Sequence, residues 1–131
     1  MHKFLIWALL GMITVSCSLN RINKLEDIPY MEEWFLGEMP EKQLNVFASR
    51  KKGKAKPVLL FIHGGSWRSG NKDRYGFFGR RMARRGVVTV IMDYPLSPEY
   101  KVHAMAKASA KAVNWITENV CSGACPGFCR K

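Results

Sequence analysis

The chain has 131 residues, which allows one domain at most, or part of one. Hydrophobic residues make up 47% of the sequence, which is enough for a packed core and excludes an intrinsically disordered chain. The formal net charge of +11 is compatible with an anionic partner, but the basic residues fall into two local groups, 50–56 and 68–85, that are typical of solvated faces. No helix-turn-helix, zinc-finger or aromatic stacking pattern accompanies them, so we predict no nucleic-acid partner.

Residues 1–17 are predicted to be a lipoprotein-type signal peptide. A basic start precedes a twelve-residue apolar stretch, residues 4–15, which is too short to cross a bilayer as a helix. The order Thr14-Val15-Ser16-Cys17 resembles a bacterial lipobox, with Thr14 in place of the usual leucine. We therefore expect lipidation at Cys17 and a membrane-held protein of the bacterial cell envelope. Cleavage to a free periplasmic or secreted product and a retained anchor are the alternatives.

Residues 18–41 are mixed and polar and are predicted to form a tether that runs into the domain edge. Residues 43–48 alternate weakly between apolar and polar positions and could form an edge strand. A charged turn follows. The unbroken apolar run from Val58 to Ile62, opened by Pro57 and closed by glycines, predicts a fully buried parallel strand.

The second half of the chain predicts a helix, a strand and a helix. Residues 75–85 are expected to be helical, with Gly86 as C-cap, and residues 87–92 are rich in β-branched residues, as in a buried strand. Strand, helix and strand in this order imply a parallel crossover. Residues 101–120 predict a second helix whose inward stripe is Val102, Ala106, Ser109, Val113, Ile116 and Val120.

A glycine pair follows the first buried strand, in His63-Gly64-Gly65-Ser66-Trp67. Glycine lets the backbone approach a ligand closely, and two successive N–H groups can face one developing oxyanion. A plain tight turn is the alternative for such a pair on its own.

The wider context resembles esterases and lipases of the α/β-hydrolase family. His63-Gly64-Gly65-Ser66-Trp67 resembles their HGG oxyanion motif, and Asp93-Tyr94-Pro95-Leu96-Ser97-Pro98-Glu99 resembles the stretch after the next strand in hormone-sensitive-lipase-like and feruloyl/acetyl-esterase-like members, with Pro95 where they usually have arginine. The resemblance covers residues 42–120. It implies an α/β fold, namely the amino-terminal portion of an α/β-hydrolase sheet that is mostly parallel with helices on both faces.

The resemblance also implies roles for the motif residues. Gly64 and Gly65 would supply oxyanion-hole N–H groups, His63 would brace the loop, and Trp67 would pack beside the pocket. A loop-ordering histidine and a core or rim tryptophan are the purely structural alternatives. The substrate would be a small-molecule ester, split through an acyl-serine intermediate without a cofactor.

The family's catalytic triad has no counterpart in this sequence. No G-x-S-x-G occurs, and neither an acid nor a histidine follows residue 120. Gly123-Ala124-Cys125-Pro126-Gly127 does not qualify as a cysteine version, because Pro126 lacks the N–H that the oxyanion needs. Cys121, Cys125 and Cys129 match no common zinc spacing, so no metal is predicted, although two of them could form a disulfide.

We therefore expect residues 121–131 to be a non-family tail, produced by a frameshift, a premature stop or a wrong gene end. The chain would be a truncated esterase-type hydrolase that is inactive as written. A non-catalytic exported surface or binding protein, or a basic module that contacts anionic polymers or lipid headgroups, are the alternatives.

Overall fold

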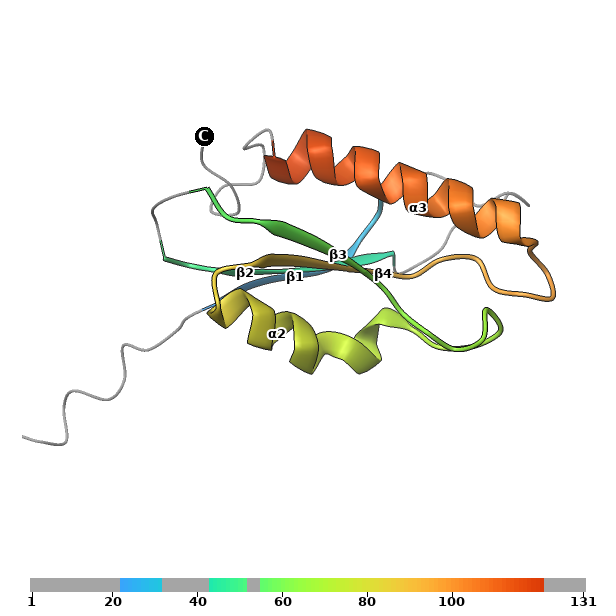
Figure 1. The fold of residues 1–131 in the computed structure, drawn as a ribbon, viewed down its shortest axis with the longest axis horizontal. Helices are drawn as coiled ribbons and strands as arrows, with labels where there is room; N and C mark the ends of the chain where they lie inside the picture. The colour runs from blue at the N-terminus through green and yellow to red at the C-terminus, as the bar shows by residue number, and fades with distance from the viewer. Residues whose placement is uncertain (1–21, 32–42, 52–54, 122–131) are drawn as a thin grey trace, which may run out of the picture.

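The structure is a computed structural model that describes residues 22–31, 43–51 and 55–121. The predicted signal peptide with Cys17, and the predicted tail beyond residue 121, lie outside the described residues. A four-stranded sheet lies between two helices, α2 on one face and α3 on the other, as the resemblance implies (Figure 1). The elements in chain order are β1 (Ile22–Ile28), β2 (Leu44–Ser49), β3 (Val58–Ile62), the 3₁₀ helix η2 (Lys72–Tyr75), α2 (Gly76–Arg84), β4 (Val88–Met92), α3 (Val102–Ile116) and the π-helical turn η3 (Thr117–Cys121).

The sheet is mixed, with the strand order β1-β2-β4-β3. Only β3 and β4 pair in parallel, with Val58 opposite Val88, so the predicted strand–helix–strand crossover through α2 is confirmed. β1 pairs with β2 and β2 with β4 in antiparallel fashion. The expectation of a mostly parallel sheet is therefore wrong for the described strands, because β1 and β2, the two amino-terminal strands, make antiparallel pairs.

The strand β3 is less buried than predicted. It lies at the edge of the described sheet, its side chains are partly exposed, and Ile62 is 42% exposed. The neighbouring strand β4 is buried along its whole length, because it has β2 on one side and β3 on the other. An apolar run predicts that a strand is covered on both faces, but it does not say whether both edges are paired.

Two other strand predictions need correction. Residues 22–28 were expected to be tether, but they form β1 and pair with β2. β2 was expected at an edge, but it lies between β1 and β4, and all six of its residues are buried. Both faces of β2 are covered, because Leu44, Val46 and Ala48 belong to the core on the α3 side while Phe47 belongs to the core on the α2 side.

The helix α2 packs very closely on the sheet through a glycine. A Cβ on Gly79 would lie 2.4 Å from Cδ2 of the Phe47 ring, so a larger residue would push the helix away from β2. Ala83, one turn later, is also buried in this second core cluster. Small residues on α2 thus let the ring of Phe47 fill the space between helix and sheet.

The inward face of α3 differs from the predicted one. Val102 is 68% exposed, and Ala106 and Val113 are exposed as well, whereas Ile116 and Val120 are buried as expected. The buried face also contains Ala104, Met105, Ala108 and Ala112. Three of these are alanines, whose small side chains allow the helix to lie close to the sheet, and the prediction gave too much weight to the larger valines. In the described part of the chain, no helix is long and apolar enough to cross a membrane.

Candidate functional site

The glycine motif forms a tight turn at the carboxyl end of β3. The N–H groups of Arg68 and Ser69 both donate to the Gly65 carbonyl, each at 3.1 Å. Gly65 has a φ of 138°, and Ser66 and Trp67 follow at 54° and 63°, which are left-handed values that non-glycine residues adopt at a cost. A Cβ on Gly65 would lie 1.9 Å from the Ser69 carbonyl oxygen, so this position requires glycine on steric grounds as well.

The space beside Gly64 is open. A Cβ placed on Gly64 would meet no atom of the described residues within 4 Å. Among those residues, the hydrogen bonds inside the turn are donated by Arg68 and Ser69 and not by Gly64 or Gly65. Gly64 therefore borders open space, whereas Gly65 is enclosed by the turn.

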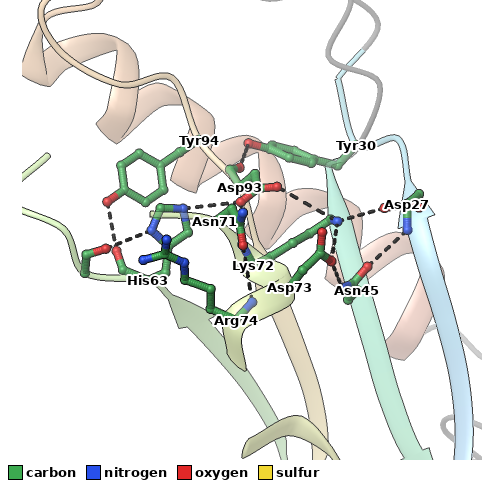
Figure 2. A network of polar contacts seen from close by, with 11 residues as sticks. Asp27, Tyr30, Asn45, His63, Asn71, Lys72, Asp73, Arg74, Asp93 and Tyr94 are labelled. Atoms are coloured by element: carbon green, nitrogen blue, oxygen red, sulfur yellow. Dashed lines mark hydrogen bonds and ion pairs between the residues drawn. The ribbon is translucent and has the colours of Figure 1, made fainter. Parts of the chain in front are cut away.

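His63 ties this loop to the segment after β4 (Figure 2). The imidazole is buried, with Nδ1 3.0 Å from the Gly64 carbonyl oxygen and Nε2 3.3 Å from Oδ1 of Asp93. Its ring stacks on Tyr94 with centroids 4.5 Å apart, and the Tyr94 hydroxyl donates to the His63 carbonyl at 2.8 Å. Both ring nitrogens are thus engaged by groups of this chain, and one face of the ring is covered by Tyr94.

The pairing with Asp93 changes the protonation of His63. Burial lowers the pKa of the imidazole, but the hydrogen bond to Asp93, the contact with the Gly64 carbonyl and the carboxylate's charge raise it by more. The net result is a pKa above the ordinary value of 6.5. The protonated imidazolium is therefore favoured next to Asp93, and it can donate from both nitrogens.

Lys72 is a further member of the network, and sequence analysis did not find it. Its ammonium is fully buried, with Nζ 2.7 Å from Asp27, 3.0 Å from Asp73 and 3.9 Å from Oδ2 of Asp93 (Figure 2). The Lys72 backbone N–H also donates to Oδ1 of Asp93 at 2.7 Å. Burial lowers the pKa of Lys72, but the hydrogen bonds to Asp27 and Asp73 and the surrounding negative charge raise it above its ordinary value, so the side chain stays charged.

The two sequence motifs meet in space. Besides the contacts of His63, the Ser97 N–H donates to the Trp67 carbonyl at 2.8 Å, and the exposed Trp67 indole lies edge-on to the Tyr94 ring, with centroids 6.1 Å apart. Tyr30 adds a contact from the amino-terminal segment, since its hydroxyl donates to the Asp93 carbonyl at 2.8 Å. The loop after β3 and the loop after β4 therefore form one polar cluster at the carboxyl ends of two parallel strands, where open α/β sheets place their ligands.

Comparison with known sequences identifies the family to which the chain belongs. Residues 59–127, more than half of the chain, match the sequence model of a family described by the alpha/beta hydrolase fold. The chain belongs to the α/β-hydrolase family. The match continues past residue 120, where sequence analysis placed the end of the family-like segment.

Relatives of this α/β-hydrolase chain carry the names of enzymes that hydrolyse carbonyl compounds. A rice protein (Oryza sativa subsp. japonica) named probable isoprenylcysteine alpha-carbonyl methylesterase is 30% identical over 84 residues, which are 64% of this chain and 20% of that protein. A zebrafish (Danio rerio) kynurenine formamidase is 27% identical over 89 residues, which are 68% of this chain and 28% of that protein. The chain thus spans between a fifth and three tenths of the length of these relatives.

Solved structures agree on the fold. Esterase B from Lactobacillus rhamnosis superimposes with a TM-score of 0.64 at 19% identity, covering 89% of this chain and 38% of that one. An esterase from the archaeon Pyrobaculum calidifontis gives a TM-score of 0.57 at 22% identity, covering 90% of this chain and 36% of that one. The α/β-hydrolase fold is therefore established, while the activity of the whole protein is a matter for proposal.

Within the described residues of this α/β-hydrolase, no group of three His, Cys, Asp or Glu side chains is placed to hold a metal ion. The acidic residues near the loop are instead directed at Lys72 and His63. The described site therefore consists of a glycine turn and a buried ionic network next to it.

Proposed function

We propose that this chain provides the oxyanion-binding part of a carboxylic ester hydrolase, with the N–H groups of Gly64 and Gly65 as donors. The observation that carries the proposal is the loop itself: Gly65 is fixed by the turn, while the space beside Gly64 is open. The names of the relatives support the reaction class, because methylesterases and formamidases both pass through a tetrahedral oxyanion at a carbonyl carbon.

The mechanism assigns the remaining steps to groups outside this sequence. A serine on a strand-to-helix turn attacks the ester carbonyl and forms an acyl-serine, a histidine carries the proton, and an acid orients the histidine. The two glycine N–H groups stabilise the negative oxygen, each by about 3 to 4 kcal/mol in the transition state. His63 and Trp67 act as loop supports, through Asp93 for the former and through Ser97 for the latter.

The first test is an ester assay on the 131-residue chain alone. Because the sequence contains no G-x-S-x-G, hydrolysis of p-nitrophenyl acetate and butyrate should not exceed the uncatalysed background. Hydrolysis that saturates with substrate and disappears on denaturation would contradict the assignment of the nucleophile to a segment outside these residues.

The second test addresses the turn that positions the oxyanion donors, because alanine at position 65 keeps the backbone N–H but its Cβ would displace the loop. Residues 58–70 replace the corresponding strand and loop of an active esterase of the same fold, and Gly65→Ala is introduced into this chimera. The proposal expects kcat to fall by about 10²- to 10³-fold with a much smaller change in KM, whereas the exposed neighbour Arg68→Ala should stay within about twofold. A folded chimera that tolerates Gly65→Ala would contradict the role of this loop.

We also propose that the protein is exported and lipid-anchored at Cys17, on the strength of the lipobox-like order Thr14-Val15-Ser16-Cys17 alone. In cells that express the chain and are grown with radiolabelled palmitate, the wild-type protein should become labelled and the Cys17→Ser variant should not. If the chain is instead a non-catalytic surface protein, the palmitate label should still appear on the wild-type protein, but the chimeric esterase that carries residues 58–70 should be inactive.

A further inference from the structure

The outer face of α2 carries a concentration of positive charge. Four exposed residues lie on the side of the helix opposite Gly79 and Ala83: Phe77, Arg81 one turn later, and Arg84 with the C-cap Arg85 after a further turn. We call these four residues the α2 basic face. α2 covers one face of the sheet (Figure 1), and because its glycine and alanine side packs on Phe47 of β2, the opposite side of the helix is directed away from the sheet.

Acidic residues near this face are already paired. α2 itself contains no Asp or Glu. Asp73, which precedes the helix, binds the buried Lys72, and Glu26 on the adjacent strand β1 forms an ion pair with Lys24. Lys24 lies over the Phe47 ring, with Nζ 5.9 Å from the ring centroid, so the Lys24–Glu26 pair adds no net charge to this side of the sheet. The arginines thus create an uncompensated positive surface among the described residues.

An exposed aromatic ring lies within this charged surface. Phe77 is 66% exposed, one helical turn before Arg81. A large apolar side chain flanked by arginines matches the interface of an anionic bilayer, where the ring enters the headgroup region and the guanidinium groups bind lipid phosphates. A nucleic-acid backbone would bind the arginines through its phosphates, but it would make no favourable contact with the phenyl ring unless a base stacked on that ring.

The route of the chain places this face near the predicted anchor. Ile22, the first residue of β1, packs in the same cluster as Ala83 of α2, and the chain enters β1 beside the carboxyl end of α2 (Figure 1). Cys17 stands five positions before Ile22, so the intervening backbone can extend by about 17 Å at most. A lipid on Cys17 would therefore hold the arginine-rich end of α2 close to the membrane surface.

We propose that the α2 basic face docks on an anionic phospholipid surface, with Phe77 in the interface and Arg81, Arg84 and Arg85 on the phosphates. The docking is separate from the ester chemistry and does not need lipidation, since the contacts are made by α2 itself. Its effect is to orient the domain, so that the loop after β3 keeps a fixed position relative to the membrane.

The test compares vesicle binding of the full 131-residue chain and of the variant Arg81→Gln/Arg84→Gln/Arg85→Gln. The probes are vesicles of phosphatidylcholine alone and vesicles with one third phosphatidylglycerol, in low salt. The apolar amino-terminal stretch contributes to both, so the ratio of the two partition coefficients reports the charge effect. The triple substitution should lower this ratio by roughly a hundredfold, and the wild-type ratio should fall steeply with added salt.

A charge-matched control separates this face from net charge. Lys101→Gln/Lys107→Gln/Lys111→Gln removes three exposed positive charges from α3, which covers the opposite face of the sheet. This variant should keep most of the wild-type ratio. An equal loss in both variants would overturn the proposal, because binding would then depend on total charge only.

Phe77→Gln distinguishes a bilayer from a nucleic acid. Its binding to the anionic vesicles should fall several-fold, with circular dichroism unchanged because the ring is exposed. Tighter binding of the chain to a 20-base-pair DNA duplex than to the vesicles, lost in the arginine variant and kept in Phe77→Gln, would also overturn the proposal.

Discussion

Gly65 and its neighbour Gly64 differ in what their backbone positions permit. Gly65 combines a φ of 138° with a carbonyl oxygen 1.9 Å from where a Cβ would be, whereas Gly64 faces open space. Gly65 therefore shapes the turn, whereas Gly64 borders its open side. The two adjacent glycines look equivalent in the sequence, so only the coordinates reveal this difference.

Alanine substitutions at Gly64 and at Gly65 should therefore have unequal effects on stability. Gly65→Ala forces the turn to open and should lower the free energy of unfolding by about 2 to 4 kcal/mol, while Gly64→Ala should change it by less than about 1 kcal/mol. Urea unfolding of both variants, followed by far-ultraviolet circular dichroism, measures the two values. Equal losses would contradict the turn geometry described for Gly65.

The ion pair between His63 and Asp93 predicts a specific pH dependence. Since the folded-state pKa of His63 lies above 6.5, its contribution to stability is fully present below pH 6.5 and is lost as the pH rises through the raised folded-state value. Asp93→Asn removes the hydrogen bond and charge that raise the pKa, so the decline in stability just above pH 6.5 should disappear. Urea midpoints measured between pH 5.5 and 8.5 give this slope.

The matched control for the pH experiment is Glu99→Gln, which removes an exposed carboxylate six positions further along the chain. It should leave the slope above pH 6.5 as in the wild type. A wild-type protein whose stability increases with pH in this window would contradict the pairing of a protonated His63 with Asp93.

At the level of the elements, α3 shows how small residues decide the packing of a helix. Ala108 and Ala112 are fully buried, whereas Val113 next to them is exposed. The helix therefore lies on the sheet largely through its smallest side chains, and Val102 and Val113, two of the valines that suggested an inward stripe, are turned to the outside.

This orientation predicts opposite outcomes for two similar substitutions. Ala108→Leu should overpack the core and destabilise the protein by about 1 to 3 kcal/mol. Ala106→Leu, two positions away on the exposed side, should stay within about 0.5 kcal/mol of the wild type. Thermal unfolding of both variants tests the prediction. A larger loss of stability from Ala106→Leu than from Ala108→Leu would indicate that the side of α3 predicted from the sequence faces the core.

The elements that could be predicted are those with strong local signals. The apolar runs of β3 and β4, the glycine after α2 and the length of α3 are visible in the sequence, and so is the glycine motif with His63 and Trp67. The strand β1 could not be predicted, because Ile22–Ile28 is mostly polar and exposed and becomes a strand only by pairing with β2. Lys72 was missed because Asp27 lies 45 residues away, and a long-range ion pair leaves no periodic pattern.

At the level of the whole molecule, the described sheet has two strands with an unshared edge, β1 at one end and β3 at the other. β3 pairs with β4 on one side, and no described strand pairs with it on the other. The solved relatives are more than twice as long as the aligned part, and the family match runs to residue 127. The predicted non-family tail at 121–131 stays a prediction, although the family match includes its first seven residues, and translation of the gene from codon 121 onward in all three frames would test it.

The edge position of β3 should be visible in amide hydrogen exchange. In a parallel pair, alternate residues of an edge strand direct their N–H groups to the neighbour, so the exchange of Val58–Ile62 should alternate between slow and fast. The amides of β4, which has neighbours on both sides, should all be slow. Uniform protection along β3 would show that another segment covers this edge.

The convergence of Asp27, Asp73 and Asp93 on one ammonium also has a consequence for the order of folding. These carboxylates come from segments before β2, after β3 and after β4, so they meet only once the sheet and η2 are in place. We therefore expect the junction to form after the main folding barrier. Lys72→Met should leave the refolding rate nearly unchanged and accelerate unfolding by roughly thirtyfold, equivalent to about 2 kcal/mol, in stopped-flow experiments. A slower refolding rate would place this ionic junction in the folding nucleus, as one of the first long-range contacts that the chain makes.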